Sequence, residues 1–264
     1  MSAIVSDFAR QGLLIRSGDA SLDEAWPSSL HDALDPALLP LLPSIGEQLQ
    51  AGRAVVVRNA MQAQLAARVF EALDGVERWT AMEVFGHGPH YRQHVLLERE
   101  SPAILARCRA LFDAPASRAL ASELGGRDCS GPLEFGATRY VPGDFATEHA
   151  DDKLARSLAF VWHLARDWEP AWGGHFVWCS TGARVVPGYN TLILFDVSPA
   201  TVHAVSPVSS FARGKRLSVT GWWSDAGPAR GGDPSGGLNR WGIAHLGPGP
   251  EPLALSEPLG VFAL

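Results

Sequence analysis

Cysteine, basic charge and long apolar runs are all scarce in this sequence. The three cysteines, Cys108, Cys129 and Cys179, are scattered among 264 residues without a Cys-x-x-Cys pair, which argues against a disulfide framework and a thiolate zinc site. The net charge is −6, so no bulk basic field exists to hold a nucleic acid. No run reaches the ~20 apolar residues of a membrane span, and the N-terminus has no signal-peptide h-region. We therefore expect a soluble, cytoplasmic protein without nucleic-acid or membrane partners.

Glycine and proline, by contrast, are abundant, with 27 and 19 residues, which favours many turns between short strands. From about residue 131, short apolar runs alternate with turn residues at intervals of roughly ten, as in an antiparallel sandwich or barrel. Seven strands are expected there, a number that suits a jelly roll. Their ranges are 134–140, 146–150, 156–165, 175–180, 191–195, 201–205 and 216–223.

The first half of the chain has a different texture. A β-branched strand over 54–57 leads into a helix over 62–73, and residues 101–123 form one helix, or two broken at Pro115. We expect residues 1–130 to be an N-terminal helical support region with outer strands, 131–225 the catalytic core and 226–264 a Gly/Pro-rich tail. All three belong to one structural domain.

A His-x-Asp sequence, His149 to Asp151, is the first candidate for chemistry. About one such pair is expected by chance from this composition, so its context decides. In an extended strand, residues i and i+2 point to the same side, and both side chains can reach one metal ion. A surface turn with a solvated carboxylate is the competing interpretation.

His203, which lies 54 residues further on, is the candidate third ligand. Two imidazoles and one carboxylate leave three coordination positions open, as an iron(II) centre needs in order to hold a chelating co-substrate together with oxygen. A structural zinc site would have its positions filled. Taken alone, His203 would be a satisfied core histidine, and only its partners favour a metal site.

Arg216 begins a strand whose two faces differ. Alternation places polar residues on one face and apolar residues on the other. The polar face carries Arg216, Ser218, Thr220 and Trp222, and the apolar face carries Leu217, Val219 and Trp223. A guanidinium on an inward face is costly unless it meets an anion. A dicarboxylate co-substrate would supply that anion, whereas the alternative for Arg216 is a surface salt bridge to Asp196 or Asp225.

At this point the sequence resembles the prolyl-4-hydroxylase-like 2-oxoglutarate- and iron(II)-dependent oxygenases. The resemblance runs from about Leu133 to Asp225 and implies a mainly β fold, a double-stranded β-helix (jelly roll) core with supporting helices. It rests on five segments in order: Tyr140 with Pro-Gly-Asp and His-x-Asp-Asp, 167–174, 190–195, 203–207 and 214–223.

Carried over by position, the resemblance implies that His149, Asp151 and His203 are the iron ligands and that Arg216 anchors the distal carboxylate of 2-oxoglutarate. An aspartate at position 151 favours hydroxylation over halogenation.

Three further positions follow from the resemblance. Thr220 adds a hydroxyl contact to the co-substrate, and the phenol of Tyr140 faces the co-substrate pocket. His163 stands where some members have a second tyrosine, so its imidazole either bonds the carboxylate or simply packs.

The implied cofactors are Fe(II), 2-oxoglutarate as co-substrate and O₂, with ascorbate as an optional addition. The implied reaction hydroxylates an unactivated C–H bond, in a prolyl or other side chain of a peptide or protein, and releases succinate and CO₂. The alternatives are an oxygenase acting on a free amino acid or secondary metabolite, and a non-catalytic jelly-roll binding protein. A nucleic-acid demethylase is disfavoured because that branch resembles Arg-x5-Arg, and here Trp222 takes the second position.

The segment His87 to His94, with His90 between them, is the main competitor for a metal ion. No acidic residue lies within it, and we expect either a rim of the substrate opening or an exposed loop. Trp172 and Trp222 are candidates for the mouth of the pocket.

Overall fold

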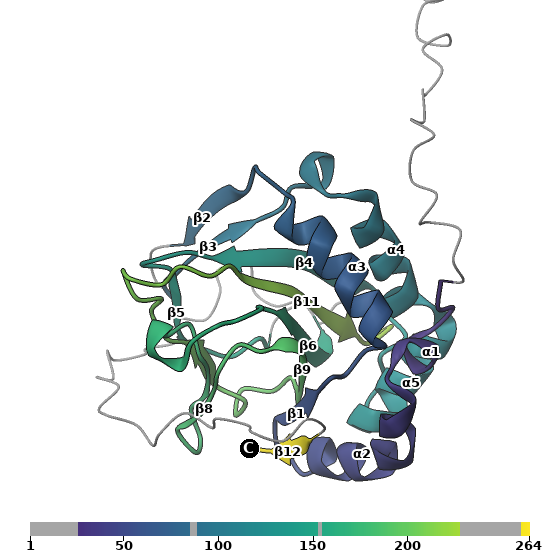
Figure 1. Cartoon of the computed structure of the whole chain (residues 1–264). Helices are drawn as coiled ribbons and strands as arrows, with labels where there is room; N and C mark the ends of the chain where they lie inside the picture. Colours follow the sequence, from purple (N-terminus) through teal and green to yellow (C-terminus); the bar gives the residue numbers. More distant parts are fainter. Residues whose placement is uncertain (1–25, 85–88, 153–154, 228–259) are drawn as a thin grey trace, which may run out of the picture.

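The computed structural model describes residues 26–84, 89–152, 155–227 and 260–264. In these ranges the chain forms one antiparallel sheet that curls round on itself, with the helices gathered along one side and β5 and β8 on the far side (Figure 1). This is the mainly β, jelly-roll architecture that the sequence predicts. None of the helices in the described ranges has both the length and the apolar character needed to span a bilayer.

The sheet brings strands from both halves of the chain together. Its order is β12-β1-β9-β6-β11-β4-β3-β5-β10-β7-β8, and β2 pairs with β3. The strands are β1 (Val55–Arg58), β2 (Thr80–Val84), β3 (Tyr91–Val95), β4 (Leu133–Tyr140), β5 (Phe145–His149), β6 (Arg156–Leu164), β7 (Phe176–Trp178), β8 (Ala183–Val185), β9 (Tyr189–Asp196), β10 (His203–Val205), β11 (Arg216–Ser224) and β12 (Val261–Ala263).

Each of the seven expected strands is present, with ends shifted by a few residues. The sequence prediction did not include four others: β2, β3, β8 and β12. β12 is the described end of the predicted tail and pairs with β1, whereas residues 228–259 of that tail lie outside the described part of the chain.

The helices are set by local sequence signals. Ser29 caps α1 by accepting a hydrogen bond from the Asp32 amide. The segment 101–123 forms two helices, because Ala114 is extended and Pro115 takes the first position of the next helix. The helices are α1 (Leu30–Ala33), α2 (Leu42–Gln50), α3 (Ala63–Asp74), α4 (Ala103–Asp113) and α5 (Pro115–Gly125), with short 3₁₀ turns at Pro36–Leu41, Glu98–Glu100 and Pro170–Trp172.

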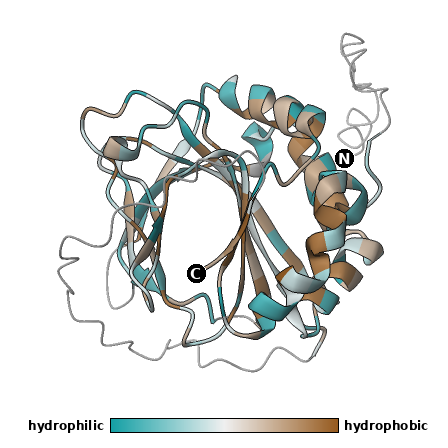
Figure 2. Cartoon of the chain, turned by 60° about the horizontal axis from the view of Figure 1, so that its bottom comes forward, coloured by the Kyte–Doolittle hydropathy of each residue, from teal (hydrophilic) through white to brown (hydrophobic). Residues whose placement is uncertain are grey.

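The main hydrophobic core lies between the helices and the outer face of the sheet. Leu217, Val219 and Trp223 of β11 pack there with helix residues such as Phe112, in agreement with the alternation predicted for this strand. Figure 2 shows the helices against one side of the curled sheet, with hydrophobic and hydrophilic stretches alternating along them. The helices therefore cover the outer face and leave the inner face of the sheet available for a site.

Candidate metal centre and active site

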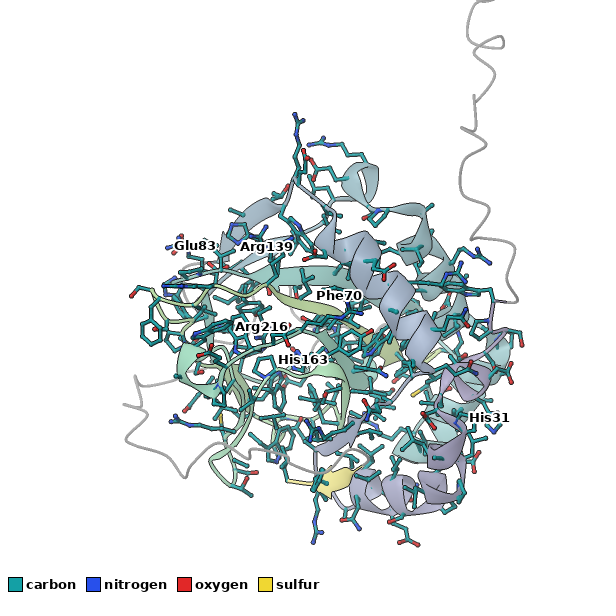
Figure 3. All side chains as sticks on the ribbon, viewed as in Figure 1. His31, Phe70, Glu83, Arg139, His163 and Arg216 are labelled. Carbon is teal, nitrogen blue, oxygen red and sulfur yellow. The ribbon has the colours of Figure 1, made fainter. Side chains whose placement is uncertain are left out.

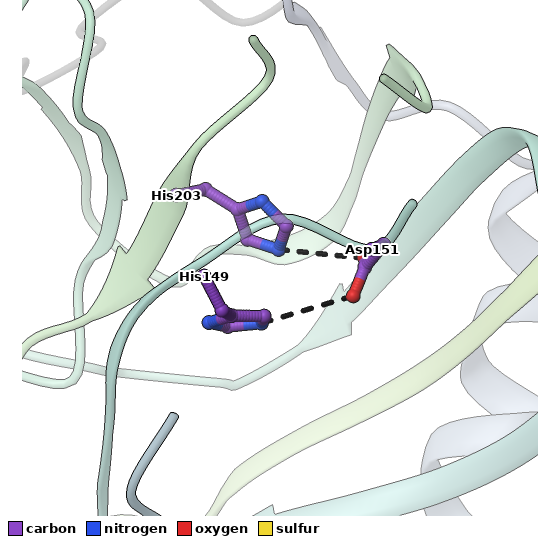
Figure 4. A group of neighbouring side chains, drawn as sticks. All are labelled: His149, Asp151 and His203. Carbon is purple, nitrogen blue, oxygen red and sulfur yellow. Dashed lines mark ion pairs between the residues drawn. The ribbon is translucent and has the colours of Figure 1, made fainter. Parts of the chain in front are cut away.

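Two paired strands bring the distant histidines together. β5 ends at His149 and pairs with β10, which begins at His203, so that the two residues stand directly opposite each other. Their ring centroids are 4.3 Å apart. One ligand atom from each of His149, Asp151 and His203 lies within 4.8 Å of the others (Figure 4). Although 54 positions separate His149 from His203 in the sequence, these two residues and Asp151 present three potential metal-ligating atoms to one point.

Asp151 reaches the histidines from outside the strand. The sequence argument used the alternation of an extended strand to bring the two side chains to one side, but β5 ends at His149, one residue before the end of the expected strand 146–150, and Asp151 lies in the segment that follows. The two side chains converge without that alternation. Asp151 Oδ1 is 3.8 Å from His149 Nε2, and Asp151 Oδ2 is 3.5 Å from His203 Nε2.

Backbone carbonyls fix the tautomer of both imidazoles. His149 Nδ1 lies 2.7 Å from the Thr147 carbonyl oxygen, and His203 Nδ1 lies 3.1 Å from that of Thr201. A carbonyl only accepts, so in the neutral ring Nδ1 carries the proton and Nε2 keeps the lone pair that a metal ion needs. Burial, reinforced by the neighbouring His149, lowers the pKa of His203 to about 4, against an opposing effect of Asp151. His203 is therefore a neutral ligand at physiological pH.

Arg216 is 2% exposed, yet no carboxylate in the described part of the chain pairs with it. Its Nε donates to the Gly174 carbonyl oxygen at 2.6 Å, and its guanidinium carbon lies 4.3 Å from the Tyr140 ring centroid. Burial lowers the pKa of Arg216 to about 10, so it remains charged at neutral pH. The alternative of a surface salt bridge to Asp196 or Asp225 is wrong, because Arg216 is buried and pairs with neither residue; Asp196 pairs instead with Arg127.

Gly174 is required where it stands. Its φ is +65°, and a Cβ there would lie 2.9 Å from Arg216 Cδ, so a larger residue would displace the guanidinium. The glycine pair 173–174 of the sequence motif therefore lets the backbone pass close to Arg216 and accept its hydrogen bond.

The triad and Arg216 open onto one cavity of about 290 Å³. Thr220 and Tyr140 line it as well, as do the hydroxyls of Ser218 and Thr138, which are 2.8 Å apart. The apolar part of the wall includes Ala159, Val161, Phe176, Phe195 and Val205. The polar face predicted for β11 is therefore the face that lines the cavity.

Tyr140 has a partner that the sequence did not indicate. Its hydroxyl donates to Gln93 Oε1 at 2.9 Å, and burial raises its pKa to about 12, so the phenol stays neutral. Gln93 comes from β3, one of the strands missed in the sequence analysis, which explains why this contact was not foreseen.

His163 is fully buried, and neither of its ring nitrogens has a hydrogen-bond partner. It lies on β6 two residues beyond Val161, a cavity-lining residue, and alternation places both on the inner side of the sheet. Burial and the nearby Arg216 hold its pKa well below the usual range, so its imidazole is neutral. Figure 3 labels both His163 and Arg216 in the interior of the sheet.

The competing histidine segment does not form a cluster of metal ligands where it is described. His90 Nε2 is 3.0 Å from Glu83, and His94 Nδ1 is 2.9 Å from Asp144, while His87 lies outside the described residues. Within the described ranges, the His149, Asp151 and His203 group is the one that could hold a metal ion.

Asp144 is a second residue whose role the sequence analysis missed. It is fully buried, and its carboxylate accepts a hydrogen bond from the Val141 amide and meets both Arg92 and His94 of β3. It therefore ties β3 to the turn that leads into β5 and His149. Its place in Pro-Gly-Asp, at the end of a tight turn, was the available signal.

Of the two tryptophans proposed for the mouth, Trp222 lines the cavity and Trp172 does not. Trp222 also donates its indole N–H to Asp151 Oδ2 at 2.8 Å, a contact with a candidate metal ligand that the sequence does not reveal.

The donors present fit an iron(II) ion and a diacid. Two imidazoles and one carboxylate form a facial set suited to iron(II). Arg216 is a buried cation with no acidic partner in the described chain, and His163 beside it has two unpartnered nitrogens. An anionic group at that end of the cavity would satisfy both, since buried polar groups are normally paired.

Comparison with known proteins agrees with this geometry. Residues 135–224 match the model of the 2OG-Fe(II) oxygenase superfamily. The chain is 29% identical over 137 residues to prolyl 3-hydroxylase OGFOD1 of Mus musculus, covering 48% of this chain and 25% of that protein, and 30% identical over 100 residues to the Xenopus laevis protein, covering 34% and 19%. It thus spans a quarter or less of these relatives' length.

Two solved structures share the fold. A prolyl-4-hydroxylase from Pseudomonas putida superposes with a TM-score of 0.53 at 21% identity, covering 70% of this chain and 100% of that one. A prolyl hydroxylase from Trichoplax adhaerens, in complex with a hypoxia inducible factor peptide fragment, gives 0.51 at 18% identity, with 70% and 90% covered. Residues 135–224 are therefore similar to the 2OG-Fe(II) oxygenase superfamily, and the chain shares its fold with these two prolyl hydroxylase structures.

Proposed function

We propose that this protein is a 2-oxoglutarate- and Fe(II)-dependent dioxygenase that hydroxylates an unactivated C–H bond and releases succinate and CO₂. The observation that carries the proposal is the meeting, in one cavity, of three metal-ligating side chains with a buried guanidinium that has no acidic partner in the described chain. A jelly roll with a purely structural role would have no reason to leave such a charge unpaired.

Each site residue has a distinct role in this proposal. His149, Asp151 and His203 hold the iron, and Arg216 binds the distal carboxylate of 2-oxoglutarate through its planar fork. The bound iron supplies the activation of O₂ and the oxidising power for the C–H bond.

The remaining residues shape the co-substrate end of the cavity. His163 donates a hydrogen bond to the same carboxylate through one of its unpartnered nitrogens, and the Thr220 hydroxyl adds a contact from the strand that carries Arg216. Tyr140 supports the guanidinium with its ring. The aromatic wall of Phe176 and Phe195 excludes water from the reacting end.

We propose a prolyl or other side chain of a peptide or protein as the substrate. Support comes from the relatives, which are named as prolyl hydroxylases, one of them in complex with a peptide. We also propose a cytoplasmic location, because all three cysteines are unpaired, as expected in a reducing compartment.

The test is the release of labelled CO₂ from 1-[¹⁴C]-2-oxoglutarate with Fe(II) under air. We expect release to rise when a library of proline-containing peptides is added, more than with a pool of free amino acids and metabolites, and Asp151→Ala to abolish it. A rise with the metabolite pool alone would contradict the peptide substrate. No release above the Asp151→Ala background in any arm would contradict the activity itself.

A further inference from the structure

Three side chains form a chain of contacts that ends at the Asp151 carboxylate. Trp222 Nε1–H donates to Asp151 Oδ2 at 2.8 Å. The guanidinium carbon of Arg156 lies 3.9 Å from the Trp222 ring centroid. Glu134 then accepts two hydrogen bonds from Arg156, at Nε and Nη2.

The sheet places these residues side by side. Trp222 on β11 stands directly opposite Glu134 on β4, and Arg156 begins β6, the strand on the other side of β11. Three neighbouring strands therefore fix the plane of the indole: Arg156 stacks on it, and Glu134 holds Arg156. The direction of the Trp222 N–H is set by this packing before any metal binds.

The bond to Trp222 has a consequence for metal coordination. A carboxylate can bind a metal ion through one oxygen or both, and a hydrogen bond to one oxygen makes it the poorer ligand. With Oδ2 hydrogen-bonded to the indole, Oδ1 is the oxygen left for the metal; its contacts with His149 Nε2 and Arg156 Nη1, at 3.8 and 3.7 Å, are longer than a hydrogen bond. A one-oxygen aspartate keeps three of six octahedral positions open, enough for a two-atom chelate and O₂, whereas two-oxygen binding would close one of them.

We infer that Trp222 is a positioning residue that limits Asp151 to one-oxygen coordination and orients it toward His149 and His203, with Arg156 and Glu134 holding the indole in place. The inference rests on the metal site of the proposed function. Trp222 then acts on the metal ligand Asp151. It does not act by contacting the substrate, which is the role that its place at the mouth of the pocket first suggests.

The experiment measures Co(II) binding to the full chain, without substrate or 2-oxoglutarate, by titration calorimetry and by the visible absorption of the bound ion, whose intensity reports coordination number. Trp222→Phe keeps an aromatic ring and removes the donor. We expect its Co(II) dissociation constant to rise about tenfold and its visible spectrum to change. If Trp222 only contacted the substrate, Trp222→Phe would change neither the Co(II) dissociation constant nor the visible spectrum.

Trp223→Phe is the matched control. Trp223 is the next residue on β11, faces the opposite side of the sheet and donates its indole N–H to the Phe112 carbonyl oxygen at 3.0 Å. We expect this variant to lower the melting temperature and leave both Co(II) readings unchanged. An unchanged Co(II) affinity and spectrum in Trp222→Phe would overturn the inference. Equal losses of Co(II) affinity in Trp222→Phe and Trp223→Phe would also overturn it, because the loss would then come from altered packing alone.

Glu134→Gln is the second test of this inference if Trp222→Phe does not fold. Arg156 Nη1 already lies 3.7 Å from Asp151 Oδ1, and without the Glu134 charge Arg156 is no longer held on the indole and is drawn toward that oxygen, where it competes with the metal. A several-fold weaker Co(II) affinity is expected, and an unchanged affinity would overturn the inference. Absence of Co(II) binding by the unaltered protein would instead overturn the proposed function, and the inference with it.

Discussion

The two faces of strand β11 differ in how their polar groups are satisfied. On the outer face, Leu217, Val219 and Trp223 lie in the main core, and the one indole N–H there has a backbone partner. On the inner face, Arg216 is buried without an acidic partner in the described chain, and the neighbouring His163 has two unpartnered nitrogens. The outer face provides stability, while the inner face keeps buried polar groups free for a ligand at a cost in stability.

The largest expected effect on stability comes from the outer face. Phe112 is buried and stacks on Phe160 and Trp223, with centroids 4.5 and 5.9 Å apart. Phe112→Ala should lower the free energy of unfolding by about 3–5 kcal/mol, since it leaves a cavity in a close-packed cluster. Urea unfolding measures the loss, and the 2-oxoglutarate affinity of the folded protein should not change. A changed 2-oxoglutarate affinity in Phe112→Ala would contradict the claim that the outer face provides stability and the inner face provides ligand binding.

Arg216→Met tests the inner face. The 2-oxoglutarate dissociation constant should rise by at least 30-fold, corresponding to about 2–5 kcal/mol, because the distal carboxylate loses its charged partner. The free energy of unfolding of the ligand-free protein should stay the same or increase, since a buried unpaired charge is removed. Calorimetric titration and urea unfolding give the two quantities. An Arg216→Met variant with unchanged 2-oxoglutarate affinity and a lower free energy of unfolding would show that Arg216 stabilises the fold and does not anchor the carboxylate.

A smaller effect is expected at His163. His163→Phe should raise the ligand-free unfolding free energy by about 1 kcal/mol, because two unpartnered nitrogens are lost, and should weaken 2-oxoglutarate binding about fivefold.

Trp162→Phe is the matched control for His163, since Trp162 is the adjacent residue on β6, faces the core and donates to Asn190 Oδ1 at 3.1 Å. That control should lose stability and keep its 2-oxoglutarate affinity. Equal affinities in the two variants would mean that His163 only packs.

The smallest effect concerns pH and is confined to the outer face. Burial raises the pKa of the Cys108 thiol from 9.0 to about 12. The unfolded chain therefore releases this proton first as pH rises, and stability falls from about pH 9 upward, by about 1 kcal/mol between pH 9 and 10. Cys108→Ala should reduce this slope without altering 2-oxoglutarate affinity. An identical slope in both proteins would show that Cys108 does not titrate as its burial implies.

The sequence predicts the inner face of β11 well because alternation is a local property. Arg216 and Thr220 line the cavity as expected, and each of the seven strands of the second half is present. The convergence of His203 with His149 needed the motif order as well, since the β5–β10 pairing joins residues far apart in the chain.

What the sequence did not reveal depends on contacts between distant strands. Gln93 meets Tyr140, and Asp144 meets Arg92 and His94, only because β3 joins β4 and β5. β3 carries the mixed sequence Tyr-Arg-Gln-His-Val, which has no clear hydrophobic alternation. The contact between Trp222 and Asp151 likewise depends on the segment after β5 leaving the sheet, which periodicity does not predict.

The most direct test of the central claim is the visible absorption of the protein with Fe(II) and 2-oxoglutarate under anaerobic conditions. The unaltered protein should show the weak charge-transfer band of the chelate, Asp151→Ala and His203→Ala should show none, and Arg216→Met should need far more 2-oxoglutarate to reach it. Absence of the band in the unaltered protein at millimolar 2-oxoglutarate, or its persistence in both triad variants, would contradict a metal and diacid site on the inner face of this sheet.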